Sequence, residues 1–309
     1  MWPALPYEEW KDTCATLHLW TQVVGKVRLA FTPWLNHSWH ATLYVTSRGL
    51  TTSPIPFGRG SFNIEFDLVG HGLVIRASDG AEERLALRPQ SVAAFYAAFM
   101  AALKRLGIEA TIKERPCEIA GAIPFSQDSV HASYDPQFAN RFQQVLVQVD
   151  RVFKQFRTGF IGKASPVHFF WGSFDLAVTR FSGRRAPLFQ GTAPGVAREI
   201  MQDAYSHEVS SAGFWPGGNG VDACFYSYAY PAPEGFAKAP VRPAAATFSE
   251  TLGEFLLPYE AVRTASDPDA ALFAFLQSTY DAAANLAHWD RDALERPVGI
   301  PGVCPPPSP

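Results

Sequence analysis

The residues best suited to chemistry lie together in one short stretch, residues 205–218, which reads YSHEVSSAGFWPGG. His207 can give or take a proton near neutral pH, and Glu208 beside it can orient or balance the imidazole. Tyr205 and Trp215 are aromatic and suited to holding a ring or a sugar. We therefore predict a site for hydrolysis or proton transfer centred on His207.

Recognised catalytic motifs are incomplete around this stretch. A zinc protease has a second histidine four residues after the first, and Ser211 occupies that position here. His37 and His40 are three apart in an expected strand, so their side chains point to opposite faces and would not share a metal. The sequence contains no GxSxG elbow. We predict no metal site, with a metal held by residues distant in sequence as the alternative.

A second candidate segment is HFFWGSFDLAVTRF, residues 168–181. Strict alternation in a strand places Asp175 on the face that carries Trp171, and a bulge at Gly172 would bring His168 to the same face. Asp175 would then orient or balance the acid–base histidine. A turn cap or a partner for an arginine is the structural alternative for this carboxylate.

Tyrosines form the third candidate feature. FYSYAY, residues 225–230, is predicted to be a strand with Tyr226 and Tyr228 on one face. Such a row of phenols suits a ligand pocket, and it equally suits a sheet face covered by a helix. Before this strand we predict a helix over residues 195–208, which would run into the histidine stretch, end at Gly213 and be followed by a glycine turn.

Four further helices are predicted from apolar residues spaced three and four apart. Ser91, Asp135 and Asp267 stand where a side-chain oxygen can cap a helix start, and Pro136 suits a first turn. These helices would cover the faces of the sheets. They span residues 7–24, 91–107, 136–156 and 267–289.

Period-two alternation predicts strands between the helices. In FNIEFDL, Phe62, Ile64 and Phe66 would face inward while the polar residues between them face water. Further strands are predicted within residues 73–89, 168–181, 223–230 and 253–260. Together these elements indicate an α+β fold with largely antiparallel sheets covered by amphipathic helices.

The order of helix, strands and helix occurs twice, over residues 7–107 and 136–288. Residues 25–49 and 162–183 both begin with Gly-Lys, carry a central Trp and reach Leu-x-Val-Thr before a glycine. We hypothesise an internal repeat of two related α-β-β-α halves, with chance similarity as the alternative. The predicted parts are residues 1–125, residues 126–296 and a mobile Pro-rich tail, residues 297–309.

Composition narrows the functional classes. The chain has 309 residues with 26 Lys and Arg against 29 Asp and Glu, a net charge of −3 that disfavours nucleic acid as a partner. The N-terminus does not resemble a signal peptide and no apolar run is long enough for a membrane helix, so we expect a cytoplasmic protein with no membrane partner. The four cysteines lie far apart, which favours buried thiols over disulfides.

Four stretches of the chain are distinctive: WPALPYEEWKDTCATLHLWTQ (residues 2–22), SPVHFFWGSFDLAVTRFSGR (residues 165–184), YSHEVSSAGFWPGG (residues 205–218) and FYSYAYP (residues 225–231). With these motifs the chain resembles a bacterial family of domains of unknown function. The resemblance covers nearly the whole chain, and it implies no particular activity.

Two functions follow as hypotheses. In the first, an aromatic pocket binds a small molecule and His207 transfers a proton, with Glu208 or Asp175 as its partner. In the second, the aromatic wall binds a ligand or a protein without chemistry. Substrate, cofactor and oligomeric state are left open. The predicted ligand-binding residues are His168, Trp171, Tyr205, Trp215, Tyr226 and Tyr228.

Overall fold

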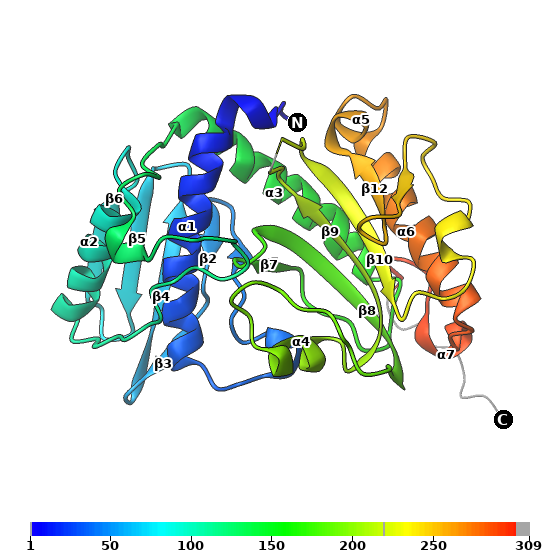
Figure 1. Ribbon diagram of the computed structural model, residues 1–309, viewed down its shortest axis with the longest axis horizontal. Helices are drawn as coiled ribbons and strands as arrows, with labels where there is room; N and C mark the ends of the chain where they lie inside the picture. Colours follow the sequence, from blue (N-terminus) through cyan, green and yellow to red (C-terminus); the bar gives the residue numbers. More distant parts are fainter. Residues whose placement is uncertain (1, 219, 301–309) are drawn as a thin grey trace.

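The computed structural model describes residues 2–218 and 220–300 (Figure 1). Within them the chain forms two antiparallel sheets of six strands each, covered by helices, which confirms the predicted α+β class. The greater part of the predicted Pro-rich tail, residues 301–309, lies outside the described residues.

The long helices begin at the predicted caps. The carboxylate of Asp135 accepts hydrogen bonds from the backbone N–H groups of Gln137 (2.7 Å) and Phe138 (3.1 Å), and Ser91 and Asp267 cap their helices in the same way. The four further helices are confirmed. The helices are α1 (Tyr7–Phe31), α2 (Val92–Arg105), α3 (Pro136–Arg157), α4 (Arg198–Ala204), α5 (Tyr259–Arg263), α6 (Pro268–Leu286) and α7 (Arg291–Leu294), with the 3-10 turns η1 (Asn36–Ser38), η2 (Phe125–Gln127) and η3 (Phe236–Lys238).

The first sheet buries one face against α1 and α2. Phe62, Ile64 and Phe66 are at most 2% exposed, as the alternation predicts, and the ring of Phe66 stacks near that of Phe95 in α2. The strand order is β1-β2-β4-β5-β6, with β3 paired to β4. The strands are β1 (Tyr44–Val45), β2 (Gly49–Thr51), β3 (Ile55–Phe57), β4 (Gly60–Asp67), β5 (Gly72–Ala77) and β6 (Glu82–Ala86).

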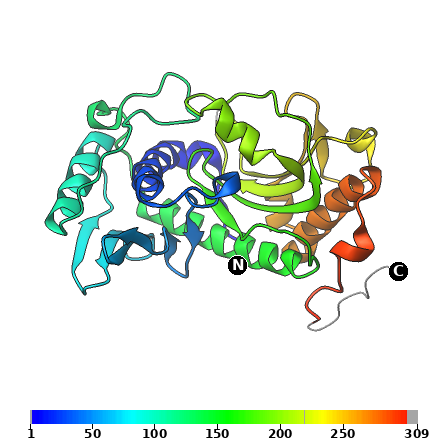
Figure 2. The ribbon, with the colours of Figure 1, turned by 90° about the horizontal axis from the view of Figure 1, so that it is seen from below.

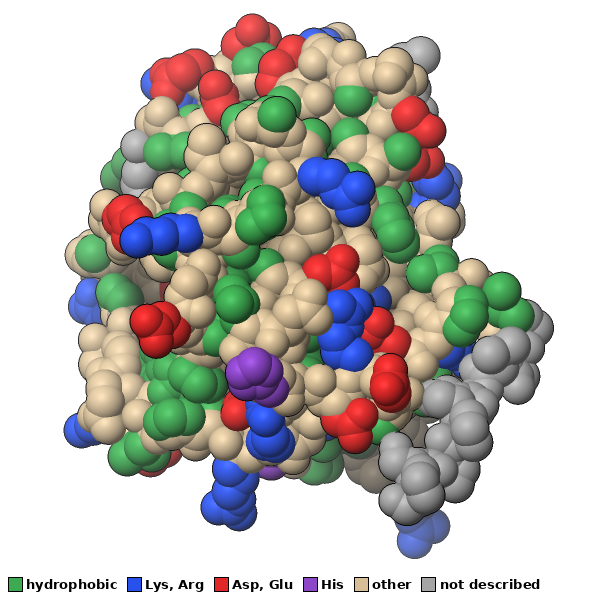
Figure 3. Space-filling model, turned by 90° about the vertical axis from the view of Figure 1, so that its right-hand side faces the viewer, with side chains coloured by type: hydrophobic (Ala, Val, Ile, Leu, Met, Phe, Trp, Pro, Cys, Tyr) green, Lys and Arg blue, Asp and Glu red, His purple; other side chains and the backbone are tan. Residues whose placement is uncertain are grey.

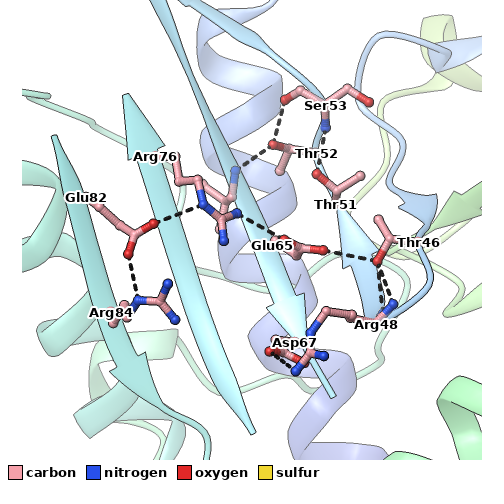
Figure 4. Close-up of polar contacts among 12 residues, drawn as sticks. Thr46, Arg48, Thr51, Thr52, Ser53, Glu65, Asp67, Arg76, Glu82 and Arg84 are labelled. Carbon is pink, nitrogen blue, oxygen red and sulfur yellow. Dashed lines mark hydrogen bonds and ion pairs between the residues drawn. The ribbon is translucent and has the colours of Figure 1, made fainter. Parts of the chain in front are cut away.

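The other face of the first sheet carries a ladder of ion pairs (Figure 4). Arg76 lies between Glu65 (3.0 Å) and Glu82 (2.9 Å), and Arg84 reaches Glu82 at 2.6 Å. Glu65, Arg76 and Glu82 come from the adjacent strands β4, β5 and β6, where opposite charges stabilise cross-strand pairing modestly. Both arginines and both glutamates are thus engaged with one another, so we place no site on this face.

The second sheet has the strand order β11-β12-β10-β9-β8-β7. In Figure 2, α3 and α6 lie on one side of this sheet and α4 lies on the other. The sheet is therefore the middle layer of this part of the molecule. Its strands are β7 (His168–Phe170), β8 (Asp175–Arg185), β9 (His207–Trp215), β10 (Cys224–Tyr230), β11 (Thr247–Ser249) and β12 (Glu254–Pro258).

The two sheets meet at one antiparallel bridge. The N–H of Leu43 donates to the carbonyl of Phe169 (2.9 Å), and the N–H of Phe169 donates to the carbonyl of Leu43 (2.8 Å). Helix α1 reaches across this seam, because the indole of Trp171 lies directly over Gly25, where a Cβ would collide with it. Buried side chains from both sheets form one contiguous core.

Residues 195–208 differ from the prediction. α4 ends at Ala204, and β9 begins at His207 and runs through Gly213, the predicted helix terminator. β9 pairs with β8 on one side and with β10 on the other, so its residues gain hydrogen bonds that a helix end cannot offer. Sheet pairing thus overrides the local helical pattern, and the prediction of a helix reaching the histidine stretch is wrong.

Both predicted halves contain a helix, six strands and a closing helix in that order, yet the strand paths differ, since β3 branches off the first sheet. The shared order of elements and the different strand paths point in opposite directions, so the internal repeat of two related halves stays a prediction. None of the helices in the described part of the chain is long and apolar enough to cross a membrane.

Candidate functional site

Strand alternation divides the second sheet into an apolar and a polar face. Leu176, Val178 and Phe225 are at most 1% exposed and lie on the face covered by helices. The opposite face, here called the polar face, is assembled by the register that pairs β8 with β9 and β9 with β10. The polar face consists of Asp175, Thr179, Ser211, Tyr226, Tyr228 and Glu254.

Asp175 is the centre of this face. It is 6% exposed, and its two carboxylate oxygens accept hydrogen bonds from the hydroxyls of Ser173 and Tyr226. Tyr226 reaches it because its cross-strand partner is Gly213: the phenol ring lies flat on the glycine, and a Cβ there would be 2.5 Å from Tyr226 Cε1. A glycine in mid-strand thus allows the phenol to lie against the sheet.

Two more carboxyl groups lie near Asp175. Burial, together with the charge of Asp175, raises the pKa of Glu118 and that of Glu254 to about 7. Burial also raises the pKa of Asp175, against the opposing hydrogen bonds from Ser173 and Tyr226. Among residues 2–218 and 220–300, neither Glu118 nor Glu254 has a side-chain hydrogen bond or an ion pair. The cluster therefore holds acidic groups without compensating cations.

Tyrosines extend the polar face away from Asp175. The rings of Tyr226 and Tyr228 are nearly parallel, with centroids 6.2 Å apart, and the hydroxyl of Tyr205 donates to that of Tyr228 at 3.1 Å. Burial raises the pKa of both strand tyrosines well above the usual value, so they are neutral phenols near pH 7. Phe189 stacks on Tyr205 with centroids 4.2 Å apart. The result is an aromatic wall with hydroxyl tips.

Two other segments border the polar face. Gln22 of α1 fixes the loop before Glu118, because its side chain donates to the carbonyl of Cys117 (2.9 Å) and accepts from the N–H of Cys117 (2.9 Å). The N–H of Glu118 donates to the carbonyl of Pro194 (2.6 Å), which ties this loop to the segment of residues 186–206 between β8 and β9. Gly172 leaves room for the Glu118 carboxylate, since a Cβ there would collide with it.

The structure separates His207 from Asp175. His207 begins β9, six residues before Gly213, which corresponds to about 20 Å along an extended strand. Its Nδ1 lies 3.1 Å from the hydroxyl of Ser206. Glu208 is engaged elsewhere, in an ion pair with Arg184 (2.7 Å). Of the three predicted catalytic residues, only Asp175 lies at the polar face.

His168 does share the side of Asp175. Residues 171–174 form a turn between β7 and β8, not a continuous strand, and the register pairs His168 with Ala177, two residues after Asp175. The turn therefore places His168 on the side of Asp175, as a bulge at Gly172 was expected to do. His168 itself is 1% exposed and enclosed by Trp39 and other rings, and burial lowers its pKa to about 3. It is a neutral core histidine.

The two predicted tryptophans have different surroundings. Trp171 is 8% exposed in the turn before β8, and its indole N–H donates to the carbonyl of Ala41 at 2.5 Å. It joins α1 to the second sheet and does not line the polar face. Trp215 is half-buried at the end of β9, two residues beyond Gly213 and therefore on the same face as Tyr226. The predicted residues that gather at the polar face are Asp175, Tyr205, Trp215, Tyr226 and Tyr228.

Sequence reasoning missed Glu118 and Glu254. Glu118 lies in an irregular loop, where no periodicity indicates where a side chain points. Glu254 begins a strand, and its alternation with Phe255 predicts a polar side, but only the pairing of β12 with β10 shows that this side is that of Tyr226.

Potential metal ligands were compared with the residues of the polar face. Residues 2–218 and 220–300 contain no group of three His, Cys, Asp or Glu side chains placed to hold a metal ion. The polar face instead offers carboxyls that change protonation near neutral pH beside phenols that donate hydrogen bonds. Such a set can bind hydroxyl-bearing molecules and move protons to and from them.

Comparison with known proteins gives one match. No curated protein and no solved structure matches the chain. A family model matches residues 2–296 and so includes every residue of the polar face. The chain belongs to DUF5996, a family of unknown function.

Proposed function

We propose that the polar face binds a small molecule and exchanges protons with it through Asp175, Glu118 and Glu254. The observation that carries this proposal is the pair of glutamates whose pKa burial and Asp175 raise to about 7. A group with a pKa near the working pH serves equally well as acid and as base. Perturbed carboxyls of this kind cluster at functional sites.

Exposure of the same groups supports a pocket. Glu118 and Ser173 are exposed, and Glu254, Tyr226 and Tyr228 are half-buried. Burial is nevertheless the largest cause of the raised pKa of each of the two glutamates and the two tyrosines. Side chains that water reaches but that protein largely surrounds are typical of the wall of a recess. We infer that the aromatic pocket expected from the sequence opens here.

The chemistry follows from the protonation states. Near pH 7 one glutamate can donate a proton while the other accepts one, and Asp175 sets the balance between them. Hydrolysis or proton transfer on a neutral, ring-bearing or sugar-like substrate fits this arrangement. The separation of His207 from the polar face favours carboxyls over the imidazole in this role.

A non-catalytic binding protein is the second candidate. It is favoured by the mutual hydrogen bond of Tyr205 and Tyr228, which makes a wall able to hold a ring without any proton transfer. Figure 3 shows side chains of Lys and Arg interspersed with those of Asp and Glu on the face at the α6 and α7 end, so neither sign dominates that face. This mixed surface supports a small molecule over a polyanion as the partner.

Carboxyl titration tests the proposal directly. We expect ¹³C NMR of labelled glutamate side chains to give two midpoints near 7 that move down in Asp175→Asn, because the variant removes the neighbouring charge. Glu208→Gln is the matched control, since it removes a carboxylate paired with Arg184. Midpoints near 4.5 for both Glu118 and Glu254 in the wild-type protein would contradict the proposal.

Assays with a panel of substrates distinguish an enzyme from a binding protein. Turnover of 4-nitrophenyl esters or glycosides that is lost in Asp175→Asn and kept in Glu208→Gln would establish the enzyme. Sugars or aromatic alcohols that raise the Tm of the wild-type protein but not of Asp175→Asn, without turnover, would establish the binding protein.

The three described cysteines, Cys14, Cys117 and Cys224, carry free thiols. Free thiols are what a reducing compartment maintains, so a cytoplasmic location stays part of this proposal.

A further inference from the structure

A lysine and a histidine meet beside Phe181, six residues along β8 from Asp175. Lys163 Nζ lies 2.7 Å from Nε2 of His37, and Nδ1 of His37 lies 3.0 Å from the carbonyl oxygen of Ala204. Because a carbonyl oxygen can only accept, Nδ1 carries the hydrogen and Nε2 carries the lone pair. The Lys163 ammonium therefore donates to Nε2 of a neutral imidazole.

His37 is held in place through its backbone and through its ring. It is 5% exposed, and its backbone N–H donates to the carboxylate of Asp203 at 2.9 Å. Its ring packs against Phe181, with centroids 4.7 Å apart. A histidine fixed in one tautomer with its free nitrogen on a lysine has the arrangement of base, orienting group and nucleophile.

Lys163 differs from the paired lysines of the same chain. Lys11 lies 2.7 Å from Glu8 and Lys154 lies 2.6 Å from Asp150, whereas Lys163 has no carboxylate within ion-pair distance in the described ranges. Its side chain is exposed, so a reagent in solution can reach it.

Two rings guide the end of the Lys163 side chain. Nζ lies 5.3 Å from the ring centre of Trp39 and 4.7 Å from that of Phe181. Burial lowers the pKa of this amine, against the opposing charge of Asp203, while the rings themselves favour the ammonium. His207 also faces the dyad, with its ring 6.3 Å from that of His37. The rings form an apolar wall beside a partly desolvated amine.

We propose that Lys163 is a nucleophilic lysine that forms a Schiff base with an aldehyde or ketone, with His37 as its proton acceptor. The ammonium passes a proton to Nε2 of His37, and the free amine attacks the carbonyl carbon to form a carbinolamine. His37 returns the proton to the carbinolamine oxygen, which leaves as water. The products are a protonated imine and one water molecule, so charge and atoms balance.

Reductive trapping with benzaldehyde tests the proposal. The flat, apolar aldehyde suits the walls formed by Trp39 and Phe181, and cyanoborohydride supplies the hydride that converts the imine to a stable benzylamine. At pH 7, peptide mapping by mass spectrometry should show Lys163 labelled at least about fivefold faster than Lys11 and Lys154. This ratio corresponds to an about fivefold larger fraction of Lys163 present as the free amine. The two paired lysines are internal controls.

Two variants identify the role of His37. His37→Asn suits the positive φ of this position (61°) and shortens the side chain, so the rate at Lys163 should fall to that of Lys11. Lys163→Arg should remove the label from this peptide alone. Glu260→Gln, which changes an exposed carboxylate paired with Arg263, should leave labelling unchanged.

Labelling of Lys163 in the wild-type protein at or below the rate of Lys11 overturns the proposal, whatever the variants do. Labelling that stays fast in a folded His37→Asn protein refutes the role of the histidine. Neither result bears on the polar face, whose test is the titration of Glu118 and Glu254.

Discussion

Replacing Gly213 with alanine should displace Tyr226 from Asp175. The new Cβ would lie 2.5 Å from Tyr226 Cε1, whereas carbon atoms in contact are about 3.5–4.0 Å apart, so the ring must move by about 1 Å or more. The phenol hydroxyl, which donates to Asp175, is carried away with the ring.

The cost can be worked out from two contributions. Forcing extra volume into a packed site costs about 1–3 kcal/mol, and losing a hydrogen bond to a charged group costs about 1.5–3 kcal/mol. Alanine recovers about 0.5–1 kcal/mol because it loses less backbone entropy than glycine on folding. We expect Gly213→Ala to lower the free energy of unfolding by about 1.5–5.5 kcal/mol.

Urea unfolding of Gly213→Ala in the wild-type, Tyr226→Phe and Tyr226→Ala backgrounds shows where the cost arises. In Tyr226→Phe the hydrogen bond is already absent, so Gly213→Ala should cost only the displacement of the ring. In Tyr226→Ala the space is empty, and the same change should be close to neutral. Equal losses in all three backgrounds would refute the reasoning, because the cost would then come from the strand and not from the phenol.

Two further predictions concern pH and helix capping. The pKa of Glu254 is raised from 4.5 to about 7 in the folded protein, so the stability gained from its proton is present below pH 4.5 and lost as the pH rises through 7. Glu254→Gln should therefore unfold at higher urea than wild type at pH 8 and at equal urea at pH 4.5, and equal urea at both pH values would contradict the raised pKa. Asp135→Ala should lower the free energy of unfolding by about 1 kcal/mol through loss of the α3 cap, and Asp135→Asn by clearly less; an equal loss for both would contradict a capping role.

Helix starts and strand faces were predictable because they depend on local rules. The cap at Asp135 and the alternation of Phe62 with Ile64 require only neighbours in sequence. The start of β9 at His207 was not predictable, because residues before it continue a helical pattern and only pairing with β8 and β10 overrides it.

The candidate site was predictable in part for the same reason. Tyr226 and Tyr228 share a face by alternation alone, and Asp175 was recognised as a strand carboxylate. Their meeting with Glu118 depends on a loop that Gln22 holds from a distant helix, and no sequence pattern encodes that contact. The grouping of His207 with Trp215 rested on closeness in sequence, and the extended strand β9 separates His207 from Gly213 by about 20 Å.

The carboxyl cluster draws on both predicted halves of the chain, because Gln22 of α1 fixes the loop that carries Glu118. Glu118 falls before the predicted boundary at residues 125 and 126, Asp175 falls after it, and α1 belongs to the first half. Each predicted half contributes one sheet, but neither half alone would carry the carboxyl cluster. If the halves descend from one ancestor, the cluster is younger than their fusion, and an excised half would be a scaffold without the groups proposed to do its chemistry.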